Sequence, residues 1–458
     1  MKEIELKLTL AGEAADAFRN DESLRQISLQ PPKTEHLDNQ YFDTPDLLLN
    51  QSHAALRIRK TPTQYVQTLK NKGTAIAGLH QRGEWESPLH VAQGQAPQLD
   101  WNALPAEARP DESVRANIQP LFKTDFQRTT WLLSRNQSQI ELVLDEGHIS
   151  RGDHLTALCE IELELKAGQA SDLFELALEL AQRFPLVPCD VNKAERGYQL
   201  MNPKLSFFQP YTCTLDQLDT QTLLNDALTR VSRRWDDFVY SRNWWLLVVI
   251  QREVSAVQLV LKTVQADSDL QARWADVWQA LNSIIKPAQL PVGLFVDRNN
   301  NSLGLSQRIL RSIDKYIDNQ LHQLVQSNVL GLAILSLGKH LFLHTYDSAS
   351  AAQLRTALND TAMQLQDLDA TNIDAQLNRL GDMQALAYVY RRCQSDAYDG
   401  VNSYVDQLLI VAGMRQANQV LPSLQDQDSR AKLASWTRRI TVELRALQDA
   451  HRGLGKQH

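Results

Sequence analysis

The 458-residue sequence is poor in cysteine and has no long hydrophobic run. Its four cysteines, Cys159, Cys189, Cys213 and Cys393, form no CxxC pair, which excludes a zinc ribbon and offers no disulfide framework. The most apolar stretch, Trp244 to Ile250, is far too short to cross a bilayer. The N-terminus carries acidic residues where a secretory signal needs a basic stub and an apolar run. These absences predict a cytoplasmic protein with no membrane partner.

The sequence also lacks the basic excess that a nucleic acid partner would require. Its 47 Lys and Arg residues stand against 54 Asp and Glu residues, which gives a net charge of −7. The whole acidic excess lies in residues 1–210, and the remainder of the chain carries 25 charges of each sign. Any polyanion must therefore meet basic side chains that are concentrated locally.

Two kinds of residue pattern meet at a short segment with two prolines and several aromatic residues, from Asn202 to Tyr211. The chain is also too long for one ordinary hydrophobic core. We therefore predict a first domain over residues 1–202, a linker over residues 203–210 and a second domain over residues 211–458.

The first domain alternates apolar and polar residues, a pattern that is typical of β-strands. Eight segments show it: Lys2–Leu10, Leu37–Phe42, Ala54–Lys60, Tyr65–Lys70, His80–Leu89, Phe126–Ser134, Gln139–Glu146 and Leu155–Lys166. Apolar residues at three- and four-residue spacing predict helices over Glu13–Ser28 and Ser171–Arg183. Because eight antiparallel strands are enough to close a barrel around a small lumen, we expect an eight-stranded antiparallel β-barrel with flanking helices.

The second domain shows helical spacing and no such alternation. Helices are predicted over six segments, Leu223–Tyr240, Leu246–Val264, Leu270–Ile285, Gln307–Val325, Ser350–Leu365 and Ser429–Leu447. Breaks are expected at Pro287, at Pro291, in the Asn299–Asn301 run and at Pro422. The predicted class of the whole chain is therefore α+β, with a barrel followed by an all-α bundle.

Charged residues occupy one face of most of the predicted strands. In the first strand Glu3, Glu5 and Lys7 share a face, and in the last strand Glu160 and Glu162 do the same. An antiparallel sheet with one face in water would produce this alternation too. A wetted face, however, normally includes Ser, Thr, Gln and Asn, whereas here Glu, Arg and Lys fill nearly every position. Charges of both signs can be held in an enclosed lumen when they are paired.

A lumen lined by both signs of charge suits a metal-bound phosphate chain. Arginine and lysine side chains grip phosphate oxygens, and arginine does so through two parallel hydrogen bonds. Clustered carboxylates hold Mg²⁺ or Mn²⁺, hard ions that prefer oxygen and bridge to phosphate. A triphosphate with its metals needs both sets of charges, so the pattern points to such a ligand.

The sequence Glu3-Ile4-Glu5-Leu6-Lys7 resembles the ExExK signature of the CYTH superfamily, the triphosphate tunnel metalloenzymes. Further segments resemble that family in the same order, namely Gln40–Pro45, Leu56–Arg59, Thr68–Lys70, Arg82–Glu84, Phe126–Arg128, Leu144–Gly147, Glu160–Glu162 and Asn192–Ala194. The ExExK signature alone is weak, but eight further matches over about 200 residues are specific. The resemblance implies a closed eight-strand tunnel with its charged face inward.

The resemblance also implies roles for the charged residues. The implied phosphate-binding residues are Lys7, Arg57, Arg59, Lys70, Arg82, Arg128 and Lys193. The implied metal ligands, for Mg²⁺ or Mn²⁺, are Glu3, Glu5, Glu84, Asp145, Glu160 and Glu162. Catalysis is expected to involve Lys7, Glu5 and Arg59, with in-line attack of water on a terminal phosphoryl group. Either a carboxylate or Lys7 could activate this water, and the sequence does not choose between them.

A helical domain that follows a CYTH tunnel resembles CHAD, the conserved-histidine α-helical domain associated with polyphosphate. The residues depart from that family, because the histidine and spaced arginines of its first long helix are missing from the comparable stretch, Arg252–Lys262. Two basic stripes remain, Arg308, Arg311 and Lys315 in one and Arg438, Arg445 and Arg452 in the other. Polyphosphate binding by this domain therefore stays an open hypothesis.

Tunnel proteins with a helical domain mostly resemble bacterial inorganic triphosphatases, which favours hydrolysis of tripolyphosphate to diphosphate and phosphate. One alternative is hydrolysis or cyclisation of an organic triphosphate such as thiamine triphosphate or ATP. Another is polyphosphate binding without catalysis. The full set of carboxylates argues against the last, because a tunnel that only binds phosphate could lose its metal ligands.

Overall fold

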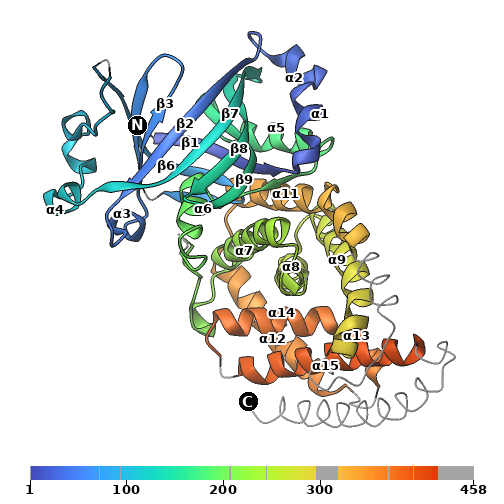
Figure 1. Cartoon of the computed structure of the whole chain (residues 1–458). Coiled ribbons are helices and arrows are strands. Elements are labelled where there is room, and N and C mark those ends of the chain that lie inside the picture. The colour runs from blue at the N-terminus through green and yellow to red at the C-terminus, as the bar shows by residue number, and fades with distance from the viewer. Residues whose placement is uncertain are drawn as a thin grey trace, which may run out of the picture. The chain divides into compact units, whose positions relative to one another are not determined.

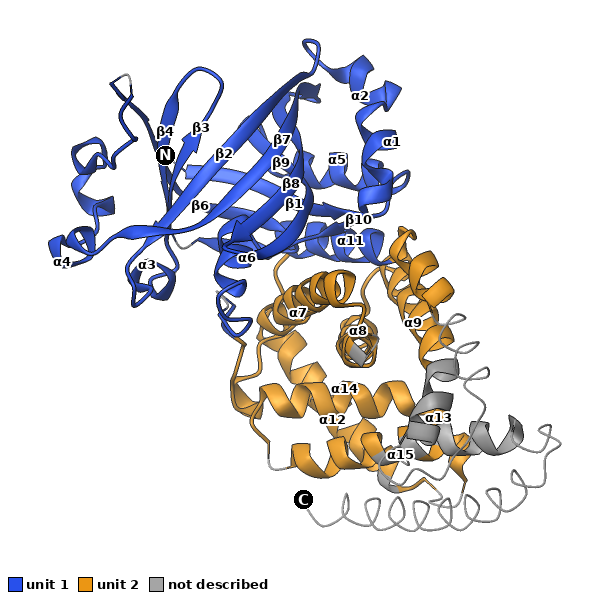
Figure 2. Cartoon of the chain, viewed as in Figure 1, with its two compact units in different colours: residues 1–209, 330–343 blue, residues 210–329, 344–458 orange. Residues whose placement is uncertain are grey.

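The computed structural model describes residues 2–71, 73–92, 94–205, 208–243, 245–295, 318–368, 372–395 and 397–420. The chain forms two compact units, drawn in blue and orange in Figure 2. The first unit contains residues 1–209 and 330–343, and the second contains residues 210–329 and 344–458. Residues 330–343 come from the second half of the sequence and yet belong to the first unit.

Ten strands of the first unit form one antiparallel sheet (Figure 1). They are β1 (Lys2–Leu10), β2 (Lys33–Asp43), β3 (Ala55–Lys60), β4 (Tyr65–Lys70), β5 (Thr74–Ile76), β6 (Leu79–Leu89), β7 (Gln119–Arg135), β8 (Ser138–Arg151), β9 (His154–Ala167) and β10 (Leu186–Pro188). Eight of them close a ring in the order β1-β9-β8-β7-β2-β3-β4-β6, because β6 pairs back to β1. The predicted eight-stranded antiparallel barrel is confirmed.

The register of the barrel sets the direction of its charged side chains. Residues directly opposite each other in an antiparallel pair share a face of the sheet. Glu5 lies opposite His80 of β6, and Lys7 lies opposite Glu162 of β9. Leu6 and Leu8 of β1 are fully buried on the other face. The charged faces of neighbouring strands thus join into one continuous inner surface.

Short helices accompany the barrel. They are α1 (Ala15–Arg19), α2 (Glu22–Ile27), α3 (Leu48–Gln51), α4 (Glu112–Ala116), α5 (Ser171–Ala181), α6 (Lys193–Gln199) and α11 (Val329–Leu343), with 3-10 turns at Gly12–Ala14, Trp101–Ala103 and Ala106–Ala108. Helix α5 packs against β1, β9 and β10, and α6 packs against β7 and β8. The single helix predicted over Glu13–Ser28 is divided into α1 and α2, because Asp21 accepts a hydrogen bond from the Leu24 amide and caps α2.

The second unit is helical throughout its described residues, apart from turns and connections. Its helices are α7 (Thr220–Ser241), α8 (Trp245–Thr263), α9 (Ser268–Phe295), α12 (Ser348–Gln366), α13 (Ile373–Asn378), α14 (Leu380–Arg392) and α15 (Ala397–Val420), with a 3-10 turn at Leu215–Gln217. Helix α9 continues through Pro287 and Pro291, so the breaks expected there are wrong. A proline removes one backbone hydrogen bond and often kinks a helix without ending it.

Several predictions lie outside the described residues. They are most of the helix over Gln307–Val325, the helix over Ser429–Leu447, the breaks at Asn299–Asn301 and Pro422, and the stripe residues Arg308, Arg311, Lys315, Arg438, Arg445 and Arg452. Within the described part of the chain, no helix is both long enough and apolar enough to cross a membrane.

Candidate active site in the barrel lumen

The charged side chains of the barrel strands are buried. Glu5 and Lys7 are each 2% exposed, and Asp145 is completely buried. A sheet with one face in water would leave such side chains accessible. The barrel therefore encloses these charges, as the resemblance implied.

The first charge cluster joins β1, β4 and β6. Lys70 Nζ lies 2.7 Å from Glu3 Oε1 and 3.1 Å from Glu84 Oε1. Arg82 Nε donates to Glu3 Oε2 at 2.9 Å, and the Arg82 guanidinium also pairs with Glu5. Burial by itself would lower the pKa of Arg82, but Glu5 and Glu3 raise it above its usual value. This guanidinium therefore stays charged although it is buried.

The second charge cluster joins β7, β8, β9 and the first residue of α6. Arg128 donates to Asp145 Oδ1 from Nε at 2.7 Å and to Glu162 Oε2 from NH2 at 3.0 Å. Lys193 Nζ lies 2.8 Å from Asp145 Oδ2 and 3.0 Å from Glu162 Oε1, and it also pairs with Glu160. Burial raises the pKa of Glu160. Burial acts on Glu162 in the same direction, but Lys193 and Arg128 hold its pKa well below the usual range.

Arg57 and Arg59 of β3 form a third, cationic side of the lumen. Arg59 Nε donates to Asn39 Oδ1 at 2.9 Å, and Arg57 NH1 lies 3.5 Å from the Tyr41 hydroxyl. Arg57 NH2 lies 3.8 Å from Glu86 Oε1. Burial and the neighbouring Arg57 guanidinium lower the pKa of Arg59 to about 9. A partly buried cation that is destabilised in this way favours an anionic ligand.

Comparison with known proteins identifies the family of the segment that contains these three groups of charges. Residues 1–198 match the CYTH domain family. This segment is a CYTH domain. An inorganic triphosphatase from Haemophilus influenzae is 34% identical to the chain over 200 residues, which cover 44% of this chain and 55% of that protein. The chain thus spans about half the length of this curated relative.

Solved structures of lower identity are also similar to the CYTH domain. A protein from Hippeastrum named HpAC1, described as an adenylyl cyclase with a dominant triphosphatase activity, is 19% identical with a TM-score of 0.33, covering 43% of this chain and 95% of that one. The Mimivirus capping enzyme triphosphatase is 14% identical with a TM-score of 0.24, covering 40% and 88%. The S. pombe RNA triphosphatase Pct1 is 14% identical with a TM-score of 0.20, covering 44% and 83%.

Three carboxylates of the CYTH domain have the spacing of a metal site. One oxygen each of Asp145, Glu160 and Glu162 lies within 4.8 Å of the others. Glu160 Oε2 is buried and has no hydrogen-bond partner. An all-oxygen set with a spare buried oxygen fits a hard divalent ion such as Mg²⁺ or Mn²⁺. The Lys193 ammonium contacts all three carboxylates in this structure, so a metal ion would compete with it for them.

The remaining acidic residues of the predicted metal set lie in the first charge cluster. Glu3, Glu5 and Glu84 are paired there with Lys70 and Arg82. Among the described residues, the acidic groups with metal-site spacing do not include these three. The structure therefore places the six predicted ligands in two neighbouring clusters, and Glu162 of the second lies opposite Lys7 of β1.

His80 is a lumen residue that the sequence analysis missed. Its Nε2 atom lies 3.4 Å from the Cys189 carbonyl oxygen and 3.7 Å from Asp190 Oδ1. Burial, followed by the positive charge of Lys7, lowers the pKa of His80 to about 3, so the imidazole is neutral. The signal was present, because His80 has the same strand parity as Arg82, two residues later.

Proposed function

We propose that the CYTH domain is a metal-dependent inorganic triphosphatase that hydrolyses tripolyphosphate to diphosphate and phosphate. The observation that carries the proposal is the convergence of three carboxylates with Lys193 and Arg128 in one closed barrel. A metal-loaded phosphate chain offers a partner to every one of these charges. The similarity to the H. influenzae inorganic triphosphatase supports an inorganic substrate.

The basic side chains of the lumen would bind and orient the phosphate chain. Arg57 and Arg59 would hold phosphate oxygens through paired hydrogen bonds, which relieves the cost of their burial. Arg128 would neutralise the charge that develops on the departing diphosphate. The roles of Lys70, Arg82 and Lys193 in phosphate binding belong to the same proposal.

The acidic side chains would hold the metal and the attacking water. Asp145, Glu160 and Glu162 would bind Mg²⁺ or Mn²⁺, which when bound supplies charge neutralisation at the phosphate oxygens. Lys7 Nζ lies 3.5 Å from Glu5 Oε1. This pair would orient a water molecule for in-line attack on the terminal phosphorus, with Glu5 accepting a hydrogen bond from that water.

A phosphate-release assay tests the proposal. The purified chain is given tripolyphosphate, ATP, thiamine triphosphate or long-chain polyphosphate, each with Mg²⁺ or Mn²⁺. We expect tripolyphosphate to be hydrolysed fastest, and Glu5→Ala and Arg59→Ala each to lower its turnover at least about a hundredfold. Lys60→Ala is the matched control, because Lys60 is exposed and follows Arg59 on the same strand.

Each alternative predicts a different result in that assay. Preference for ATP or thiamine triphosphate, or formation of a cyclic product, would make the inorganic substrate wrong. Binding of polyphosphate without release of phosphate from any of the four compounds would contradict catalysis altogether. The cytoplasmic location and the lack of a nucleic acid partner stay predictions from the sequence.

A polyphosphate contact in the second unit is favoured by a cluster of arginines. Five arginine side chains from α7, α8 and α14 line a cavity of about 30 Å³: Arg230, Arg234, Arg252, Arg391 and Arg392. Arg392 is 6% exposed, and its Nε atom has no hydrogen-bond partner. Burial and the neighbouring Arg230 lower the pKa of Arg392. Arg230, Arg234 and Arg252 pair with Asp226, Glu253 and Asp406, so Arg391 and Arg392 supply the positive charge that suits the oxygens of a phosphate chain.

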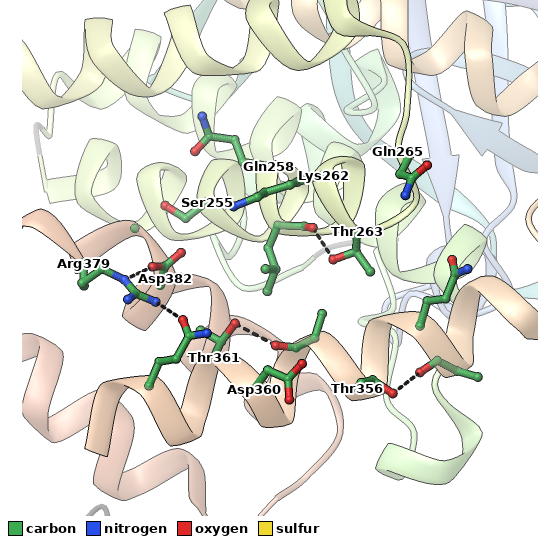
Figure 3. A pocket seen from close by; sticks show the side chains of 16 residues that line it. Ser255, Gln258, Lys262, Thr263, Gln265, Thr356, Asp360, Thr361, Arg379 and Asp382 are labelled. Carbon is green, nitrogen blue, oxygen red and sulfur yellow. Dashed lines mark hydrogen bonds and ion pairs between the residues drawn. The ribbon is translucent and has the colours of Figure 1, made fainter. Parts of the chain in front are cut away.

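A larger cavity of the second unit is a poorer place for a polyanion. It measures about 980 Å³ and is lined by residues of α8, α12 and α14 (Figure 3). Its two basic residues, Lys262 and Arg379, are balanced by Asp360 and Asp382. Arg379 moreover pairs with Asp382 in the first turn of α14 and donates to Gln364 at 3.0 Å. We therefore propose the arginine cluster for the phosphate contact.

A binding measurement with fluorescently labelled long-chain polyphosphate tests this contact. Arg392→Gln in the full chain should weaken binding at least about tenfold, because a charged hydrogen-bond donor is removed. Lys262→Gln is the control, since Lys262 is an exposed cation on α8 outside the arginine cluster. Equal affinity of the wild type and Arg392→Gln would contradict the assignment.

A further inference from the structure

Helix α11 approaches the barrel wall without room for side chains at two of its positions. A Cβ atom at Gly331 would lie 1.7 Å from the Leu186 carbonyl oxygen. A Cβ atom at Gly338 would lie 2.3 Å from the Ala77 Cβ atom. Real atoms cannot come so close, so the α11 backbone is seated directly on β10 and on the turn before β6.

Side chains fix α11 in this seat as well. Lys339 Nζ lies 3.0 Å from Glu175 Oε1 on α5. The rings of Phe342 and Phe174 pack with their centroids 5.8 Å apart. Leu335 and Leu337 of α11 are completely buried. The helix is therefore an integral part of the first unit, although the residues that flank it, up to 329 and from 344, belong to the second.

The wall beneath α11 is bonded to the backbone of Lys7. The Lys7 amide donates to the Gly78 carbonyl oxygen at 2.9 Å, and the Cys189 amide donates to the Lys7 carbonyl oxygen at 2.9 Å. Gly78 directly follows Ala77, the residue that Gly338 contacts. Both peptide groups of Lys7 are thus held by segments on which α11 rests.

We propose that α11 is a positioning element for the Lys7 ammonium, so that the second half of the chain helps to set the geometry of the tunnel. The proposal rests on the proposed triphosphatase function, in which Lys7 and Glu5 orient the attacking water. A shift of the turn at Ala77 would move the Lys7 backbone, and with it an ammonium 3.5 Å from Glu5. Displacements of this size change the rate of a positioned reaction steeply.

Gly338→Ala in the full chain tests the proposal, because the added methyl group must push α11 away from Ala77. We expect kcat for tripolyphosphate to fall at least about tenfold while KM changes less than about twofold. Amide hydrogen exchange at Lys7, Gly78 and Cys189 should become faster. Gly381→Ala is the control, since a Cβ atom there would meet nothing closer than 3.7 Å.

A second substitution distinguishes a loss of Lys7 positioning from a general loss of folding. Ala77→Gly removes the methyl group that the Gly338→Ala methyl would strike, and glycine suits the positive φ of 47° at residue 77. The double variant Gly338→Ala/Ala77→Gly should therefore recover most of the wild-type kcat and slow exchange at Lys7. If the double variant recovers neither the wild-type kcat nor slow exchange at Lys7, the effect of Gly338→Ala does not arise from its contact with residue 77, and the proposal is wrong.

The result can be told apart from failure of the proposed function. If Gly338→Ala leaves kcat and the exchange at Lys7 unchanged in an active enzyme, the positioning role is wrong. If the wild type hydrolyses none of the four phosphate compounds, the function is wrong. In that case the exchange data alone test whether α11 holds the Lys7 backbone in place. Faster amide exchange at Lys7 in Gly338→Ala, reversed in the double variant, would support this role. Unchanged exchange would overturn it.

Discussion

The Lys193 ammonium holds three buried carboxylates together. It lies within ion-pair distance of Asp145, Glu160 and Glu162. Burial would raise the pKa of Glu162, but Lys193 and Arg128 hold it well below the usual range. Without the lysine, the three acids would repel each other in a site that water hardly reaches. The Lys193 ammonium therefore neutralises the repulsion among these carboxylates, as a bound metal ion could also do.

Lys193→Met is expected to destabilise the CYTH domain by about 3–5 kcal/mol, because it leaves buried carboxylates without their partner. Mg²⁺ or Mn²⁺ should restore part of the lost melting temperature in the variant, and EDTA should remove that gain. Differential scanning fluorimetry measures both effects. Lys166→Met is the matched control, since Lys166 pairs with Glu141 and Glu164 where its side chain is 37% exposed. Equal stability losses in the two variants would contradict this account.

The alternation of side chains along each strand predicted most of the charged residues of the lumen. It did not identify the uncharged ones. The charged residues of β1, β3, β6 and β9 were found because a strand repeats its direction every two residues. Asn39 and Tyr41, which contact Arg59 and Arg57, share the inward parity of β2 but carry no charge that marks them. Which cation pairs with which acid depends on cross-strand register, and a single sequence does not contain that information.

At the scale of elements, the eight long strands were predictable and the short pieces were not. The predicted Lys2–Leu10 and Tyr65–Lys70 agree with β1 and β4 at both ends. Strands β5 and β10 have three residues each, which is too few for a period of two to be visible. Helix α6 has seven residues, too few for a helical period to stand out in the sequence.

Helices in the second half of the sequence were predicted where one face is apolar, and α11 was missed because apolar residues extend around it. Helices α7 and α12 match their predicted segments to within three residues at each end. Helix α11 is apolar nearly all round, with six leucine, isoleucine and valine side chains in its first nine residues, Val329 to Leu337, and therefore shows no helical period. Helix α14 was not predicted either, although ten of its residues are buried.

At the scale of the whole molecule, local sequence patterns could not predict two features. These are the closure of the barrel and the packing of α11 with the first unit. Closure depends on β1 pairing with both β6 and β9, which are separated from it by very different lengths of chain. Residues 330–343 pack with the first unit because Gly331 and Gly338 allow close backbone approach, a fact that emerges only when the barrel wall is present. Sequence composition divides the chain once, whereas the folded chain passes between its units three times.

Binding of a metal-loaded phosphate chain inside the barrel can be observed by anomalous scattering from crystals of the chain grown with Mn²⁺ and a slowly hydrolysed tripolyphosphate analogue. We expect a Mn²⁺ peak beside Asp145, Glu160 and Glu162, and phosphate density against Arg57 and Arg59 inside the barrel. A lumen that holds neither metal nor phosphate, with both bound on the outer surface, would contradict this expectation.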